Sequence, residues 1–200
     1  ECLGQMGIKA ISLYHNGCPP IDIEGEGVEF VVHSEAAEIF PSVWISGPVK
    51  RRHPEMNYPT GASGSKLEVR VAGDWVDDSI PESQALVVRT QNGPIVLLGC
   101  GHSGVVNALI QIQETIQDDA IHALMGGLHL FSADDQTLGW TADRLREIGI
   151  ENLMAGHCTG IEPLIRLRAG LNLNRRTAVV GAVGSSFVLD EGIRATSIAM

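Results

Sequence analysis

The sequence lacks the features of a membrane protein and of a nucleic-acid-binding protein. It has no apolar run near the roughly 18 residues that a membrane-spanning helix requires, so no membrane partner is expected. Lysine and arginine number 14 against 24 aspartates and glutamates, which gives a formal net charge of −10. Because nucleic-acid backbones are bound by clustered basic residues, no nucleic-acid partner is expected. A length of 200 residues with 44% hydrophobic residues predicts a soluble globular protein with a real core.

Cysteine is also scarce, and the four present are scattered as Cys2, Cys18, Cys100 and Cys158. Two of them lie close to histidines in glycine-containing loops, which is unlike the dense cysteine framework of a small secreted domain. We therefore expect reduced thiols and a cytoplasmic protein. The chain begins at Glu1 rather than Met, with no basic-then-apolar targeting segment, and we expect that sequence has been removed upstream.

The first 83 residues carry weaker structural signals than the rest. Residues 28–33 and 43–46 are predicted strands separated by a polar turn at 34–37, and residues 8–14 are a strand or a short helix. Residues 47–83 are rich in glycine, proline, serine and charge, and are predicted to form a long loop or insertion. Such a segment is either a substrate lid or a mobile insertion, and the sequence does not separate the two.

From residue 85 onward, the pattern is that of an α/β sheet. The predicted strands are 85–89, 95–98, 121–125, 152–155, 177–180 and 186–189, and the predicted helices are 105–117, 135–148 and 161–169. The unbroken apolar run at 95–98 is typical of a strand that is buried on both faces. Three of these strands are each followed by a glycine loop that contains a histidine, which indicates a recurring strand–loop–helix architecture.

These three histidines are the candidate chemistry of the chain. They are His102 in CGHSG, His129 in GGLHL and His157 in GHCTG. If the strands share one sheet, their carboxyl ends converge on the same edge and the histidines can meet there. Neutral imidazole is the commonest ligand of zinc-like metals, so the pattern predicts a metal site. The alternative is that each histidine only caps or hydrogen-bonds its own turn.

Other residues near these loops allow two interpretations each. Cys100 is either a soft metal ligand or a small buried residue, and Cys158, beside His157, is more often a packing residue than a ligand. The basic run Lys50-Arg51-Arg52 either meets an anionic substrate or is merely solvated.

The loop before the predicted helix 105–117 also fits a non-catalytic nucleotide-binding α/β module. Gly99, Gly101 and Gly104 have the G-x-G-x-x-G spacing of a dinucleotide-binding turn, in which the helix N-terminus would hold a pyrophosphate. The pattern is incomplete, because the next strand ends in Gly126-Gly127 and carries no acid that could bind a ribose.

Ordered motifs between about residues 84 and 188 resemble those of the metallo-β-lactamase superfamily. They are QALVVRTQNGPIVLLGCGHSGVVNALIQI, ALMGGLHLF, AGHCTG and VGSSFVL, and they are most similar to the branch of dihydropterin ribofuranosyl-aminobenzene phosphate synthase-like proteins. The resemblance implies an α/β fold of the αββα sandwich type. This chain would form roughly the C-terminal two-thirds of that sandwich, and residues 1–200 would belong to a single domain.

The resemblance also implies a metal site and a role for each histidine. The implied site would hold one or two metal ions, usually zinc, with manganese or iron as alternatives. By position, His102 and His157 match the motif histidines that bind metal, and we group Cys100 with them as a metal ligand. His129 matches the GGxHL motif, and we assign it to catalysis, near the metal or substrate. In such a site the metal lowers the pKa of bound water toward about 7, so that a metal-bound hydroxide is the nucleophile.

One family signature is missing from the chain. The clustered H-x-H-x-D-H of the superfamily is absent, because no two histidines here are separated by a single residue. We therefore expect either a fragment of a metal-dependent hydrolase or an inactive remnant. The expected substrate is a small molecule with an ester or phosphoester bond, such as a phosphate- or pterin-containing compound. The sequence does not predict the oligomeric state.

Overall fold

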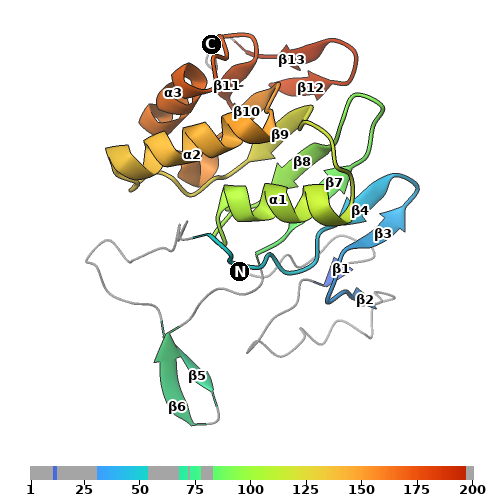
Figure 1. Cartoon of the computed structure of the whole chain (residues 1–200), viewed down its shortest axis with the longest axis vertical. Coiled ribbons are helices and arrows are strands. Elements are labelled where there is room, and N and C mark those ends of the chain that lie inside the picture. Colours follow the sequence, from blue (N-terminus) through green and yellow to red (C-terminus); the bar gives the residue numbers. More distant parts are fainter. Residues whose placement is uncertain (1–10, 13–30, 54–67, 72, 78–82, 197–200) are drawn as a thin grey trace.

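The computed structural model describes residues 11–12, 31–53, 68–71, 73–77 and 83–196 (Figure 1). Its main feature is a seven-stranded sheet in the order β11-β10-β9-β8-β7-β4-β3. The strands are β3 (Ala37–Phe40), β4 (Val43–Ile45), β7 (Ala85–Val88), β8 (Ile95–Leu98), β9 (Ala123–Gly126), β10 (Leu153–Ala155) and β11 (Ala178–Val180). From β8 to β11 the strands are parallel, whereas β3, β4, β7 and β8 pair antiparallel, so the sheet is mixed.

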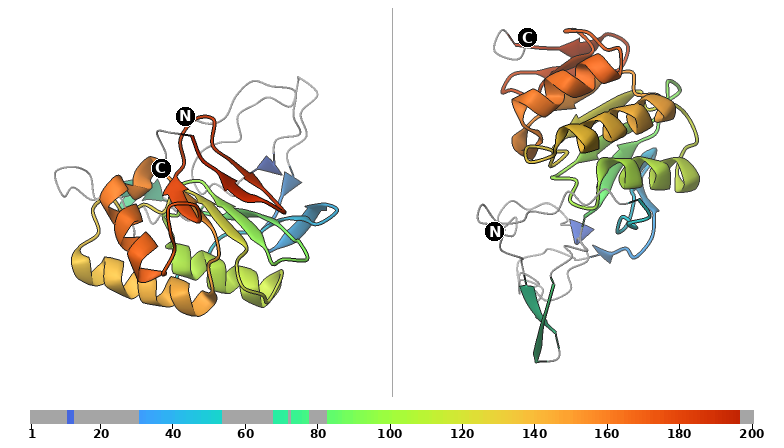
Figure 2. Two further views of the ribbon diagram at one scale, coloured as in Figure 1. Left: turned by 90° about the horizontal axis from the view of Figure 1, so that it is seen from above. Right: turned by 60° about the vertical axis from the view of Figure 1, so that its left-hand side comes forward.

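Helices connect the parallel strands, as the sequence pattern predicts. They are α1 (Val105–Thr115), α2 (Asp135–Ile148) and α3 (Ile161–Gly170), with a short 3-10 turn, η2 (His157–Thr159), before α3. Figure 2 shows α1 and α2 side by side over one face of the sheet, and α3 contacts both α2 and β11. None of the helices in the described part of the chain is long and apolar enough to cross a membrane.

The ends of α2 illustrate why the sequence predicted this helix correctly. The Asp134 side chain accepts a hydrogen bond from the Thr137 backbone N–H at 2.8 Å, which satisfies one of the free donors of the first turn. At the other end, Gly149 takes the left-handed conformation (φ 86°) and its N–H reaches the Leu145 carbonyl.

The hydrophobic core lies between the helices and one face of the sheet. Its largest fully buried side chains include Leu109 and Ile112 of α1, Leu145 of α2, Leu164 and Leu167 of α3, and Val87, Val96, Leu124 and Leu153 of the strands. Burying each such side chain is worth about 1.5–3 kcal/mol, so this layer holds the strand ends in place.

The opposite face of the sheet is apolar but only partly covered. In register across β7 to β10 lie Leu86, Leu97, Met125 and Met154, which therefore share a face. Leu97 is 37% exposed, whereas its neighbours Val96 and Leu98 on the other face are buried. The prediction that β8 is buried on both faces is thus wrong at Leu97, because the helices pack on one face only.

Three smaller two-stranded sheets complete the described structure. They are β1 (Ile11–Ser12) with β2 (Val31–Val32), β5 (Glu68–Val71) with β6 (Asp74–Asp77), and β12 (Ser186–Val188) with β13 (Gly192–Arg194). The β5–β6 hairpin lies within the segment 47–83 that we predicted to be a loop or insertion. The remainder of that segment at 54–67, 72 and 78–82, and most of the predicted elements at 8–14 and 28–33, lie outside the described residues.

The strand β3 was missed from the sequence. It is an edge strand that pairs with β4 alone, and it carries two adjacent apolar residues, Ile39 and Phe40, instead of a clean alternation. Its hairpin is closed by the Glu38 carboxylate, which accepts a hydrogen bond from the Ser42 backbone N–H at 2.8 Å. That contact depends on the folded turn, so the propensity of the separate residues did not reveal it.

Candidate metal centre

Three loops meet at the carboxyl edge of the parallel strands. Backbone hydrogen bonds join them in sequence: the Gly127 N–H donates to the Gly99 carbonyl at 3.0 Å, and the Gly156 N–H donates to the Gly126 carbonyl at 3.0 Å. The loops after β8, β9 and β10 are therefore fixed against one another. They carry His102, His129 and His157, so the predicted convergence of separate strand ends is what the structure shows.

The Gly126-Gly127 pair allows this close approach. Gly126 has φ 120°, and a Cβ there would lie 1.9 Å from the Leu98 carbonyl oxygen. A Cβ on Gly127 would lie 2.5 Å from the Gly99 carbonyl oxygen and 2.8 Å from the Cys158 sulfur. Any larger residue would thus push the loops apart and occupy the space of the Cys158 thiol.

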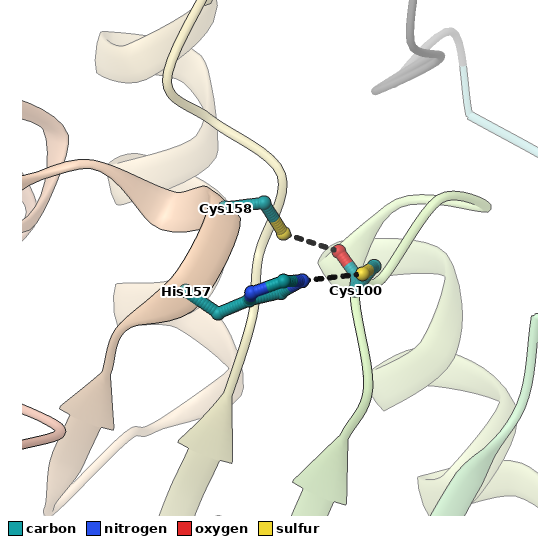
Figure 3. Close-up of side chains that lie close together, drawn as sticks. All are labelled: Cys100, His157 and Cys158. Atoms are coloured by element: carbon teal, nitrogen blue, oxygen red, sulfur yellow. Dashed lines mark hydrogen bonds between the residues drawn. The ribbon is translucent and has the colours of Figure 1, made fainter. Parts of the chain in front are cut away.

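Two thiols and one imidazole converge at this edge (Figure 3). The Cys100 Sγ lies 3.0 Å from the His157 Nε2, and the Cys158 thiol donates to the Cys100 carbonyl oxygen at 3.5 Å. One donor atom from each of these residues can be chosen so that all three lie within 4.8 Å of one another. Cys100 is partly buried and makes a polar contact, so its packing-only interpretation does not describe its surroundings.

His102 and His129 form a second pair beside these residues. Their ring centroids are 4.7 Å apart and the rings meet edge to face at 83°. His129 also contacts Phe131, with centroids 5.1 Å apart. We call Cys100, His102, His129, His157 and Cys158 together the His/Cys cluster.

The His129 ring has an unusual environment. The residue is only 7% exposed, and neither its Nδ1 nor its Nε2 has a hydrogen-bond partner in the described structure. Buried polar atoms are nearly always paired, because leaving one without a partner costs about 1–3 kcal/mol. Two open nitrogens on a buried imidazole fit the approach of a metal ion or a substrate group, so the residues present are compatible with the ligand that the fold suggests.

The electrostatics of the cluster favour neutral imidazoles. Burial, then the Arg51 guanidinium and then His157 lower the pKa of His102. The pKa of His129 is lowered first by burial and then by His102 and His157. At neutral pH the lone pairs of His102 and His129 are therefore available to a cation.

The Cys158 thiol, in contrast, holds its proton. Burial and the neighbouring Cys100 raise its pKa to about 11. A protonated thiol is consistent with its role as the donor to the Cys100 carbonyl oxygen.

Backbone strain is also concentrated here. His129 has φ 47° and His157 has φ 52°, the left-handed region that residues with a side chain seldom adopt. Such strain persists only where surrounding structure imposes it, and it is often found at functional sites.

The basic run at 50–52 divides between two roles. The Arg51 guanidinium donates to the His102 carbonyl oxygen at 3.3 Å, so it lies at the cluster. Arg52 instead pairs with both carboxylate oxygens of Glu114 at 2.6 and 2.5 Å on the exposed side of α1. Arg51 therefore lies at the cluster and Arg52 does not, and the anionic-substrate interpretation of the run stays a prediction.

Two buried amide side chains hold the segment that carries Arg51 in place. Neither was identified from the sequence. The Asn107 Oδ1 accepts hydrogen bonds from the Arg52 and His53 backbone N–H groups, both at 2.9 Å. The Gln111 Oε1 accepts from the Lys50 backbone N–H at 2.9 Å. Asn107 and Gln111 lie four residues apart within the apolar pattern of α1, and polar residues at such buried positions are the signal that could have identified them.

A pocket of about 310 Å³ adjoins the cluster. His157 lies in its wall, together with Met125, Met154, Gly127 and Ser185. Its volume is at the lower end of the range for small-molecule sites. The glycine loop at 99–104 opens onto the same edge, and its proposed nucleotide-binding role stays a prediction.

Comparison with known proteins finds a solved structure with a similar fold and a relative with a similar sequence. No protein-family profile matches the chain. Among solved structures, Tm1679, a metal-dependent hydrolase of the β-lactamase superfamily, superposes with a TM-score of 0.62 at 29% sequence identity, over 73% of this chain and 54% of that one. The fold is that of the metallo-β-lactamase superfamily.

A curated relative supports the same conclusion for the metallo-β-lactamase-like chain. The 7,8-dihydropterin-6-methyl-4-(β-D-ribofuranosyl)-aminobenzene-5'-phosphate synthase of Methanocaldococcus jannaschii is 28% identical over 144 residues, which are 70% of this chain and 47% of that protein. The resemblance and the α/β fold class expected from the sequence motifs are therefore confirmed. The chain spans about half the length of both relatives.

Proposed function

We propose that this metallo-β-lactamase-like chain contributes the carboxyl-edge half of a metal-dependent hydrolase site for a small molecule. The observation that carries the proposal is the buried His129 ring, whose two nitrogens have no partner among the described residues, beside His102 and close to His157. Buried nitrogens without partners lower the stability of the folded chain unless a bound ligand pairs with them.

The His/Cys cluster supplies candidate ligands for zinc, either one ion or two, with manganese or iron as alternatives. His102, His157 and Cys100 would hold the ion, since imidazole and thiolate are its preferred donors. When bound, a divalent ion polarises the bond under attack and lowers the pKa of a coordinated water. His129, whose ring is neutral and otherwise unpaired, would accept or hold a proton at one of its ring nitrogens.

The substrate is proposed to be a small anionic ester or phosphoester, and a phosphate- or pterin-containing compound fits best. Arg51 brings a positive charge to His102, and the adjoining pocket has the size for a small molecule. The name of the Methanocaldococcus relative describes a product with both a pterin and a phosphate, which supports this substrate class. We also propose that the protein works in the reducing cytoplasm, which the free thiols of Cys100 and Cys158 support.

The test is hydrolysis of a chromogenic phosphodiester by the metal-free chain after addition of zinc, manganese or iron. We expect turnover that EDTA abolishes, and that falls by at least about 100-fold in His102→Gln and in His157→Gln. His122→Gln is the matched control, because His122 binds Glu151 and the Leu189 carbonyl outside the cluster. Absence of turnover with every metal would identify an inactive remnant, and an equal loss in the control would refute the assigned ligands.

A further inference from the structure

We propose that Cys158 joins Cys100 and His157, two of the metal ligands proposed above, in a three-ligand site for one soft divalent ion, zinc above all. The inference goes beyond hydrolysis, because it concerns ion binding and is independent of turnover. It also gives Cys158 a role that its position beside His157 in the sequence did not indicate.

The separations of the donor atoms support this site. In a tetrahedral zinc centre, Zn–S bonds of about 2.3 Å and Zn–N bonds of about 2.0–2.1 Å place neighbouring donors roughly 3.5–3.8 Å apart. Here the Cys100 sulfur and the His157 Nε2 are 3.0 Å apart, and the whole set spans no more than 4.8 Å. Side-chain shifts of about 1 Å would therefore complete the geometry without moving the backbone.

The chemistry of the donors matches the same class of ion. Two thiolates and one imidazole are soft or borderline ligands, and the set occurs in catalytic zinc sites that leave the fourth position open. His157 is exposed and both cysteines are partly exposed, so an ion can enter from solvent. The pocket of about 310 Å³ has His157 in its wall and leaves room for a water or substrate as the fourth ligand.

The fold holds Cys158 in position through its neighbours. The Phe131 N–H donates to the Cys158 carbonyl at 3.3 Å, and the Leu128 N–H donates to the Thr159 Oγ1 at 3.0 Å. Together with the absence of a side chain at Gly127, these contacts fix the η2 turn against the loop after β9. A preformed ligand set of this kind loses little conformational freedom when it binds an ion.

The test uses cobalt(II) as a spectroscopic substitute for zinc. Cobalt(II) is added to the whole chain in a buffer that contains a phosphine reductant, so that the cysteines stay as thiols. We expect one ion per chain and a thiolate-to-cobalt charge-transfer band in the near ultraviolet. Cys158→Ser and Cys100→Ser should each remove about half of the band, because each leaves one thiolate ligand. One control is His122→Gln, which alters a histidine outside the cluster. The other is the double variant Cys2→Ser/Cys18→Ser, which alters only cysteines outside the described residues. Both should keep the full band.

A band that survives unchanged in Cys158→Ser, or that disappears in the Cys2/Cys18 double variant, would overturn the proposal. A second measurement on the unaltered chain covers the case of a variant that does not fold. Zinc should slow the alkylation of both Cys100 and Cys158 by iodoacetamide, which peptide mass spectrometry measures at each cysteine. Equal alkylation of Cys158 with and without zinc would refute the site, whereas the hydrolase proposal would still stand on its own ligands, His102, His157 and Cys100.

Discussion

At the scale of single residues, two imidazoles of the His/Cys cluster, His102 and His129, are placed where their charged forms are disfavoured. His129 is buried without a hydrogen-bond partner in the described structure, and His102 lies next to the Arg51 guanidinium. Burial and these neighbours lower the pKa of both rings below the usual value of 6.5. The fold thereby favours the neutral form that a metal ion requires.

This arrangement predicts a pH dependence of stability for the metal-free chain. As the pH falls below 6.5, the unfolded chain takes up protons on His102 and His129 that the folded chain resists, so the free energy of unfolding decreases. Urea unfolding in EDTA between about pH 7.5 and about pH 5.5 should show this decline. The double variant His102→Gln/His129→Gln should show a smaller decline, and an identical slope in both proteins would contradict the assignment.

At the scale of elements, the site depends on how closely the loops after β8, β9 and β10 approach. The ladder of backbone hydrogen bonds from Gly99 through Gly127, and from Gly126 to Gly156, sets this distance. The glycines in these loops are needed for separate reasons: Gly126 for its left-handed backbone and the nearby Leu98 carbonyl, and Gly127 for the space of the Cys158 sulfur.

Substitution of Gly126 should therefore be far more damaging than substitution of an ordinary helical glycine. Gly126→Ala puts a methyl group against the Leu98 carbonyl oxygen, and we expect a loss of at least about 3 kcal/mol in the free energy of unfolding. The matched control is Gly139→Ala in α2, where a Cβ has nothing within 4 Å. That change should stabilise the chain by about 0.5–1 kcal/mol, because alanine favours a helix. Similar urea midpoints for the two variants would show that the loop approach is not required.

At the scale of the whole molecule, the main sheet has two unequal faces. The helices bury one face, on which Leu124 is fully inaccessible, while the other presents Leu86, Leu97, Met125 and Met154 in one row. The row runs from β7 to β10, and its Met125 and Met154 also line the pocket beside His157.

Truncation at the two faces should have different costs. Leu124→Ala removes fully buried methyl groups and should cost about 2–5 kcal/mol of unfolding free energy. Leu97→Ala, at a position that is 37% exposed, should cost under about 1 kcal/mol. Denaturant unfolding of both variants measures the difference, and equal costs would mean that Leu97 is covered in solution.

Local sequence determined much of the α/β unit by itself. The helix α2 was predicted at 135–148, and the structure shows why: the Asp134 cap and the Gly149 stop that bound it act between residues that are neighbours along the chain. The same holds for the three histidine loops at the strand ends. The edge strand β3 was missed, since its pairing and its closing Glu38 contact exist only in the folded hairpin.

Tertiary structure alone decided which of these residues meet and in what state. The sequence placed His102, His129 and His157 at strand ends, but the parallel order of β8, β9 and β10 brought them to one edge. Likewise, only the packed loops show that the His129 nitrogens have no partner among the described residues, that Arg51 rather than Arg52 lies at the cluster, and that Cys158 is beside Cys100. The physical reason is that periodicity and capping are short-range effects, whereas burial, pKa and ligand geometry depend on residues that are distant in the chain.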